Sequence, residues 1–315
     1  MYIALIIIGA ILGLVVIPHI VVSYFVFYAN YRRWSDKKIR HAFDTNPDYE
    51  KTRPQMLDAY HEMEKKDSEI VEIKSFDGLT LRGRYYNNNS SKTVIFFHGL
   101  RTEPTLLFPV LALRLLNEGF NVLYIYSRGH GISDGRFTSY GYHEKKDAVA
   151  WVEYINKVKG CNNIYLYGAS MGATTIALAS PNLDPNIVKG LVIDAAYTTV
   201  DELIGHLSAL YHIPTGFFMG LVRWFGKVIL KVNFREDDTR KSLEHNKIPT
   251  LFIQGSKDNV VIIDFFNDNY DKCASTKQKI LVEGAGHAIA LTYGGEPVIK
   301  QFITFLNTNG GTLNE

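Results

Sequence analysis

A serine lies between two glycines in the stretch GASMG, residues 168–172. The residues before it, 164–167, form a short apolar run typical of a buried strand, and small, helix-tolerant residues follow it. A strand that turns into a helix through G-x-S-x-G holds its serine at the apex of a tight, strained turn, with the hydroxyl exposed. The chemistry that this arrangement favours is nucleophilic attack by Ser170 on a carbonyl carbon.

A serine hydroxyl is a weak nucleophile, so it needs a general base and a carboxylate that orients the base. The nucleophile-elbow architecture predicts the chain order serine, acid, histidine. His287, in the glycine-rich loop GAGHA, is the predicted base, and Asp258, which follows the apolar run of FIQGSKD, is the predicted acid. Asp194 in LVIDAAY also ends a predicted strand and is the alternative acid, and either aspartate could instead cap a helix. We favour Asp258.

Two backbone amides are predicted to stabilise the oxyanion that forms during such an attack. One belongs to Met171, the residue after the nucleophile, and the other to Leu100, in the loop that follows VIFFHG. His98 in the same loop precedes the elbow in the chain, so we interpret it as a structural residue and not as the base.

These residues need a scaffold that brings several loops to one edge of a sheet. The stretch EIVEIKSFDGLTLRGRYY has the pattern of a β-hairpin, and strand-like and helix-like segments alternate after it. A helix is predicted over residues 104–118. The alternation predicts an α/β fold with a mostly parallel sheet and helices on both faces.

Residues 201–248 interrupt this alternation with apolar and aromatic helical sequence. We interpret them as a cap that lies over the carboxyl edge of the sheet, where open α/β sheets bind their ligands. A second membrane span is the rival interpretation, but Arg223 and Lys227 fall in its middle. Packing on the sheet away from the site is a further alternative. The cap residues that we expect to contact substrate are Phe217, Phe218 and Trp224.

The first 31 residues carry no charged side chain, and five basic residues follow between 32 and 40. This length of apolar sequence predicts a transmembrane anchor over residues 1–31. A signal peptide would instead place its basic residues before the apolar run. Because the basic residues follow the anchor, the globular part is expected in the cytoplasm. Residues 32–68 would form a linker and helical lead-in, and residues 69–315 the globular domain.

The overall charge is nearly balanced, with 34 basic and 32 acidic residues, which gives no indication of nucleic-acid binding. His143, Glu144 and Asp147 share a predicted helix and could suggest a metal site. We favour a solvated helix face, since the proposed chemistry needs neither a metal nor another cofactor.

The motifs FFHGL, YSRGHGISDG, GASMG, GSKDNVV and GAGHA together resemble the α/β-hydrolase superfamily from about residue 70 onward. Within it the chain is similar to membrane-anchored bacterial hydrolases of the Bem46-like and serine-aminopeptidase-like branch. One departure is Tyr126, which stands where the family usually has an aspartate of structural importance. The change therefore bears on local packing more than on chemistry.

These patterns predict a serine hydrolase that cleaves a carboxylic ester, with a small-molecule acyl substrate, through a Ser-His-Asp triad and an acyl-enzyme. The membrane anchor makes a lipid-derived ester a reasonable substrate. The alternatives are a peptidase or amidase that uses the same triad, and a catalytically silent member that binds a ligand.

Overall fold

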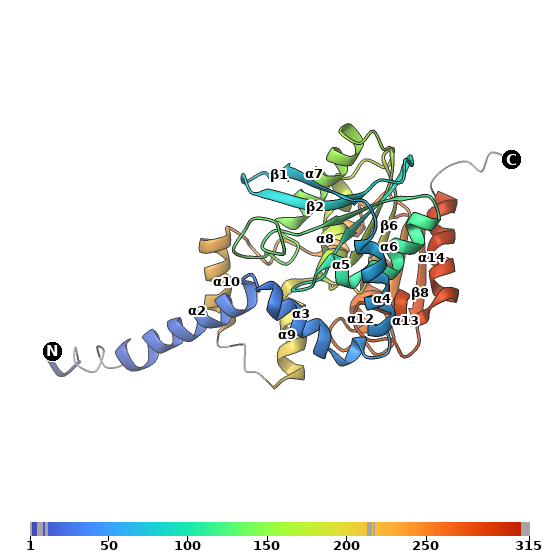
Figure 1. The fold of residues 1–315 in the computed structure, drawn as a ribbon. Helices are drawn as coiled ribbons and strands as arrows, with labels where there is room; N and C mark the ends of the chain where they lie inside the picture. Colours follow the sequence, from blue (N-terminus) through green and yellow to red (C-terminus); the bar gives the residue numbers. More distant parts are fainter. Residues whose placement is uncertain (1, 5–8, 10–11, 213–215, 217, 310–315) are drawn as a thin grey trace.

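The computed structural model describes residues 2–4, 9, 12–212, 216 and 218–309, which form a central sheet covered by helices (Figure 1). The described part contains an eight-stranded sheet in the order β1-β2-β4-β3-β5-β6-β7-β8. β1 and β2 form the predicted hairpin, β2 also runs antiparallel to β4, and all other pairs are parallel. The strands are β1 (Glu69–Lys74), β2 (Thr80–Tyr86), β3 (Lys92–Phe97), β4 (Asn121–Ile125), β5 (Asn163–Ala169), β6 (Val188–Asp194), β7 (Thr250–Gly255) and β8 (Lys277–Val282).

Helical segments follow most of the strands and cover both faces, as the alternation in the sequence predicts. In chain order they are η1 (Leu12–Val16), α2 (Ile17–Tyr31), α3 (Asp36–Thr45), η2 (Pro47–Tyr49), α4 (Arg53–Glu64), α5 (Pro104–Leu107), α6 (Pro109–Asn117), α7 (Glu144–Lys157), α8 (Met171–Ala179), η3 (Ser180–Asn182), α9 (Val200–Leu210), α10 (Met219–Phe225), η4 (Gly226–Leu230), α11 (Thr239–Leu243), α12 (Ile263–Lys272), α13 (Ala290–Gly294) and α14 (Glu296–Asn309).

Alternate residues of the central strands enter two separate hydrophobic cores. On β3, Val94 and Phe96 belong to the core under α4, α6 and α14, whereas Ile95 and Phe97 belong to the core under α7, α8 and α12. All four side chains are buried. Because successive side chains of a strand point to opposite faces, a strand covered on both sides is apolar throughout. The continuous apolar runs of the sequence have this origin.

The helix predicted over residues 104–118 is divided in two. α5 ends at Leu107, Phe108 leaves the helical region with φ −114° and ψ 15°, and α6 begins at Pro109. Proline has no backbone N–H, and it disfavours helical geometry in the residue before it. Pro109 therefore ends the first helix and serves well as the first residue of the second.

The N-terminal apolar helix is a candidate membrane span. Residues Gly13–Tyr31 form a helical stretch of 19 residues with a mean hydropathy of 1.6, long and apolar enough to cross a membrane. Figure 1 shows α2 projecting from the domain, with α10 beside its domain-proximal part. The side chains of Phe27 and Tyr31 at its C-terminal end are fully buried against the domain. The helix is therefore fixed to the domain by its last turns.

Candidate active site

Ser170 lies at the sharp turn between β5 and α8. Its backbone has φ 54° and ψ −116°, a conformation that costs energy for any residue with a side chain. The turn is so tight that a Cβ at Gly172 would overlap the carbonyl of Phe97, and one at Gly168 would overlap the carbonyl of Gly172. The two glycines of the motif are thus required by backbone packing.

The structure brings Ser170, His287 and Asp258 together from three loops at the carboxyl edge of the sheet. His287 Nε2 lies 2.8 Å from Ser170 Oγ, and His287 Nδ1 lies 2.8 Å from Asp258 Oδ2. The Asp258 side chain is fully buried, and the histidine side chain is 19% exposed. A neutral imidazole that donates through Nδ1 to the carboxylate presents Nε2 as an acceptor for the serine proton. This is the geometry needed for general-base activation.

Asp258 is held in place by two further hydrogen bonds. The backbone N–H groups of Val260 and Val261 both donate to Oδ1 at 2.9 Å, so both carboxylate oxygens have partners. Asp194, the alternative acid, instead accepts a hydrogen bond of 2.6 Å from Tyr167 Oη, and no hydrogen bond joins it to His287. Burial raises the pKa of Asp194 to about 7. Of the two aspartates, only Asp258 contacts the imidazole.

The surroundings of His287 favour its protonated form. Burial opposes the charge on the imidazole, but the charge of Asp258 and its hydrogen bond outweigh burial, and Asp194 and Asp48 add to the effect. The net result is a raised pKa for His287. Such a shift makes the imidazole of His287 a stronger base.

Leu100 and Met171, the two predicted oxyanion donors, both lie at Ser170. Both residues line the same cavity as Ser170. A Cβ placed on Gly99 would lie 3.4 Å from Ser170 Cβ, so the loop of Leu100 passes directly beside Ser170. No described protein group accepts a hydrogen bond from the backbone N–H of Leu100 or Met171. Both amides are therefore free to donate to a ligand oxygen.

Two buried histidines support the loop that carries Leu100. His98 contacts the carbonyl of Gly99 through Nδ1 and accepts from the N–H of Ser127 through Nε2. His130 accepts from the N–H of Arg101 at 3.0 Å. Burial lowers the pKa of His98 to about 3 and that of His130 to about 4. Both rings are therefore neutral supports for this loop, which agrees with the structural interpretation of His98.

A cavity of about 330 Å³ opens at Ser170 and is lined mostly by apolar side chains. Leu106 and Leu107 come from α5, and Leu203 and Leu207 come from α9 in the cap. An unexpected wall comes from the lead-in after the anchor: its lining residues are Trp34, Ile39, Ala42, Phe43, Asn46 and Tyr49. The site is thus enclosed between the cap and the segment predicted as a linker and helical lead-in.

Two of the cap residues predicted to contact substrate, Phe218 and Trp224, lie elsewhere. Neither Phe218 nor Trp224 is among the described residues that line the cavity. The Phe218 ring is tilted against that of His19, with ring centroids 5.3 Å apart, and Trp224 is 53% exposed. The physical reason is that α10 packs against α2, so its large apolar groups face that helix or solvent. Phe217 lies outside the described residues.

The lead-in also contacts the loop of the predicted base. Asp48 Oδ2 accepts a hydrogen bond of 3.4 Å from the backbone N–H of His287, and a Cβ on Gly286 would collide with the same carboxylate. Sequence reasoning missed this contribution. The available signal was the apolar pair Ile39 and Phe43, which lies on one face of α3 at helical spacing and is buried.

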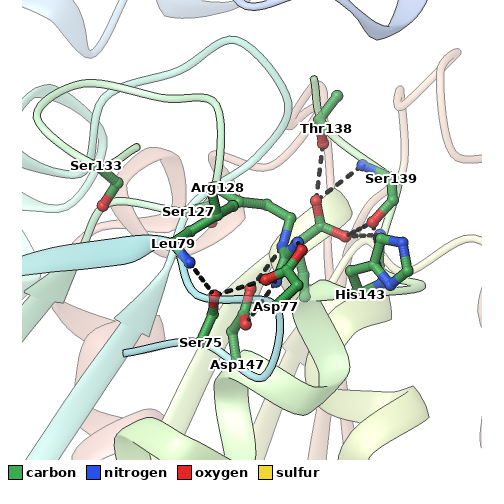
Figure 2. A network of polar contacts seen from close by, with 12 residues as sticks. Ser75, Asp77, Leu79, Ser127, Arg128, Ser133, Thr138, Ser139, His143 and Asp147 are labelled. Carbon is green, nitrogen blue, oxygen red and sulfur yellow. Dashed lines mark hydrogen bonds and ion pairs between the residues drawn. The ribbon is translucent and has the colours of Figure 1, made fainter. Parts of the chain in front are cut away.

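The face of α7 that was predicted to be solvated is in fact a buried polar network (Figure 2). Arg128 forms a salt bridge of 2.8 Å with Asp147 and another of 2.8 Å with Asp77. Glu144, also buried, accepts hydrogen bonds from the side chains of Thr138 and Ser139. The solvated-face prediction was wrong because these carboxylates find partners in the loop before the helix. Among the described residues, no cluster of three or more His, Cys, Asp or Glu side chains is arranged to hold a metal.

Comparison with known proteins agrees with this architecture. A family model described as "Serine aminopeptidase, S33" matches residues 88–245. The chain is 26% identical over 309 residues to the protein YqkD of Bacillus subtilis (strain 168), covering 97% of both chains. It is 27% identical over 222 residues to the protein bem46 of Schizosaccharomyces pombe, covering 67% of both. The esterase Pf2001 of Pyrococcus furiosus superposes with a TM-score of 0.66 at 22% identity, covering 79% of this chain and 94% of that one. The chain belongs to the serine aminopeptidase S33 family, within the Bem46-like branch of the α/β-hydrolases.

Proposed function

We propose that this hydrolase cleaves carboxylic esters with Ser170 as its nucleophile. The observation that carries the proposal is the continuous chain of hydrogen bonds from Ser170 through His287 to Asp258. The fold likeness to a protein described as an esterase adds support. The largely apolar lining of the cavity suits the acyl part of an ester.

In the proposed mechanism, Ser170 Oγ attacks the carbonyl carbon while His287 Nε2 takes the hydroxyl proton. The oxyanion of the tetrahedral intermediate accepts hydrogen bonds from the N–H groups of Leu100 and Met171. His287 then gives its proton to the departing alcohol, which leaves Ser170 acylated. His287 then takes a proton from a water molecule as that water attacks the acyl carbon, which forms a second tetrahedral intermediate. This intermediate breaks down to the free acid and Ser170 Oγ, and His287 returns the proton to the serine oxygen.

Peptidase activity is the second candidate, because the family description names an aminopeptidase and the same triad can cleave amides. An aminopeptidase must hold the protonated amine of its substrate, which calls for a carboxylate in the cavity. Glu103 is the single carboxylate among the described lining residues, and it already accepts a hydrogen bond of 2.9 Å from Thr105. This lining favours the ester over the amino-terminal peptide. A catalytically silent, ligand-binding member is the third alternative.

A fluorophosphonate probe tests the proposal directly, since it labels only an activated serine. We expect labelling of the full-length protein, and no labelling of Ser170→Ala. Ser170→Ala and His287→Ala should each lower the hydrolysis of p-nitrophenyl acetate by roughly a thousandfold or more. Hydrolysis of an aminoacyl p-nitroanilide at a higher kcat/KM than the ester would favour the peptidase. Absence of labelling in the folded wild-type protein would favour the silent member.

We also propose that the N-terminal helix anchors the enzyme in a membrane with the catalytic domain in the cytoplasm. Its support is the apolar stretch Gly13–Tyr31, followed by Arg32, Arg33, Lys37, Lys38 and Arg40. Protease added to intact cells should leave the catalytic domain uncut, and lysis should expose it. Digestion before lysis would contradict the orientation.

A further inference from the structure

A second hollow lies directly beside the active-site cavity, at the C-terminal end of α2. It measures about 520 Å³, and we call it the basic groove. Four of its lining residues are cationic, and the others are polar, aromatic or small; none is acidic. The lining residues are Tyr28, Ala29, Asn30, Arg32, Arg33, Trp34, Ser35, Lys38 and Arg101.

The cations of the basic groove have no acidic partners within the described part of the chain. Arg33 donates to the carbonyls of Ser133 and Gly131, and Arg101 donates to those of Ala29 and Asn30. No salt bridge to a described carboxylate forms at Arg32, Arg33, Lys38 or Arg101, although most arginines of the domain have one. The positive charge of this hollow is therefore left for an anion from outside the domain.

Among the four cations, Arg101 gives the strongest indication of a bound anion. Its guanidinium stacks on the Trp34 ring at 4.4 Å, and its Nε is buried without a hydrogen-bond partner. Burial lowers the pKa of Arg101, which means that its charge is poorly solvated where it stands. A buried donor without a partner is costly, and a bound anion would remove much of that cost.

The basic groove and the active-site cavity share a wall. Trp34 and Arg101 line both hollows, and Arg101 directly follows Leu100, a proposed oxyanion donor. A ligand with an anionic end and an acyl end could therefore occupy both hollows. The groove also lies where α2 would leave the bilayer, which is the level of lipid headgroups.

We propose that the basic groove binds the phosphate of an anionic membrane lipid and so selects anionic acyl lipids as substrates of Ser170. This inference rests on the proposed esterase function and on the membrane anchor. Phosphate is the chemistry that arginine and lysine recognise best, through charge-assisted hydrogen bonds. The lipid is favoured over free phosphate because the groove is placed at headgroup level and shares Trp34 and Arg101 with a largely apolar cavity.

Binding can be measured apart from catalysis with the full-length Ser170→Ala protein in an uncharged detergent. Isothermal titration calorimetry would compare dihexanoyl-phosphatidylglycerol, dihexanoyl-phosphatidylcholine and inorganic phosphate. We expect the anionic lipid to bind at least about tenfold more tightly than the zwitterionic lipid, since one charge-assisted contact corresponds to roughly this factor. Inorganic phosphate at the same concentration should not displace it.

Arg32→Gln and Lys38→Gln, each introduced into the Ser170→Ala protein, should lower the affinity for the anionic lipid by roughly tenfold. Both side chains are exposed, so the variants should fold, which their circular dichroism spectra check. Lys37→Gln is the matched control, because Lys37 is an exposed lysine of the same helix as Lys38 and does not line the groove. It should not change lipid binding by the Ser170→Ala protein. In the enzyme that keeps Ser170, it should not change the esterase activity.

Equal binding of the two lipids, or unchanged affinity in both groove variants, would overturn the proposal. Displacement of the anionic lipid by inorganic phosphate would show that the groove binds a free anion, and would overturn the proposal that its ligand is a lipid. Fluorophosphonate labelling of the wild-type protein separates this failure from failure of the esterase function, because labelling does not depend on the groove.

Discussion

At the scale of single residues, the carboxyl groups of Asp258 and Asp194 lie at the same edge of the sheet but differ in their hydrogen-bond partners. Asp258 has three hydrogen-bond donors around its two oxygens, one of which is the imidazole of His287. Asp194 is buried beside Tyr167, one of its oxygens has no partner, and its pKa rises to about 7. The first environment holds the carboxyl group of Asp258 against the imidazole, whereas the second raises the pKa of Asp194 and favours its neutral acid.

Asp258→Asn should lower kcat by roughly a thousandfold or more, because an amide cannot hold the imidazole in its required tautomer as the carboxylate does. The pH profile should change as well. The base must be neutral to act, so the wild-type rate should fall as the pH drops through the raised pKa of His287. Without the charge of Asp258 that pKa decreases, and the acid limb of kcat/KM should move to lower pH.

Asp194→Asn is the matched control for this prediction. It keeps the size of the side chain and an oxygen that can accept from Tyr167, and we expect it to reduce kcat by less than about tenfold. A larger loss of kcat in Asp194→Asn than in Asp258→Asn, with both proteins folded, would identify Asp194 as the acid that orients His287.

The serine, the base and the acid could be proposed from sequence because each follows a strand in a short motif, and the chain order of the motifs is characteristic. Asp48 could not be proposed in this way. It reaches the loop of His287 from a position 239 residues earlier in the chain, and its own neighbourhood carries no motif. Contacts of this kind depend on tertiary packing, which local pattern does not encode.

At the scale of elements, the cap contributes to the cavity through α9 and not through α10. Leu203 and Leu207 lie four residues apart on α9, so they share a face, and both line the cavity. The α10 helix uses Val222 and Phe225 against the N-terminal helix. The alternation of strands and helices predicted the position of the insertion, but not which of its apolar faces lies over the site. That choice depends on α2, which sequence alone presents only as a membrane segment.

Leu203→Ala and Leu207→Ala should therefore change the preference for acyl chain length. Each removes apolar surface from the cavity wall, and the loss of such contacts typically changes kcat/KM by about tenfold or more. Relative to acetate, p-nitrophenyl decanoate should be the most affected ester. Phe218→Ala and Trp224→Ala serve as controls and should keep the parent's selectivity. If only the two control variants change the acyl-chain preference, α10 and not α9 contacts the substrate.

At the scale of the whole molecule, the N-terminal helix belongs both to the proposed anchor and to the packed domain. The Phe27 ring lies 6.0 Å from that of Phe137 and 5.9 Å from that of Phe225. Tyr31 packs at 5.0 Å from Tyr140, which lines the active-site cavity. The packing of α2 on the domain therefore holds the cavity at a fixed position relative to the helix. If the helix spans a bilayer, the cavity lies close to the surface of that bilayer.

The same docking predicts that two phenylalanines of α2 differ sharply in their contribution to stability. Phe27 is fully buried in the aromatic cluster with Phe137 and Phe225, whereas Phe25 is 63% exposed. Phe27→Ala should lower the free energy of unfolding by about 3 kcal/mol or more, since it leaves a cavity among large side chains. In the full-length protein in detergent this corresponds to a decrease in Tm of roughly 6 °C or more. Phe25→Ala, two residues away in the same helix, should leave Tm nearly unchanged. If both variants unfold at the wild-type temperature, α2 is a tether that does not pack on the domain, and the fixed placement of the cavity near the membrane no longer follows.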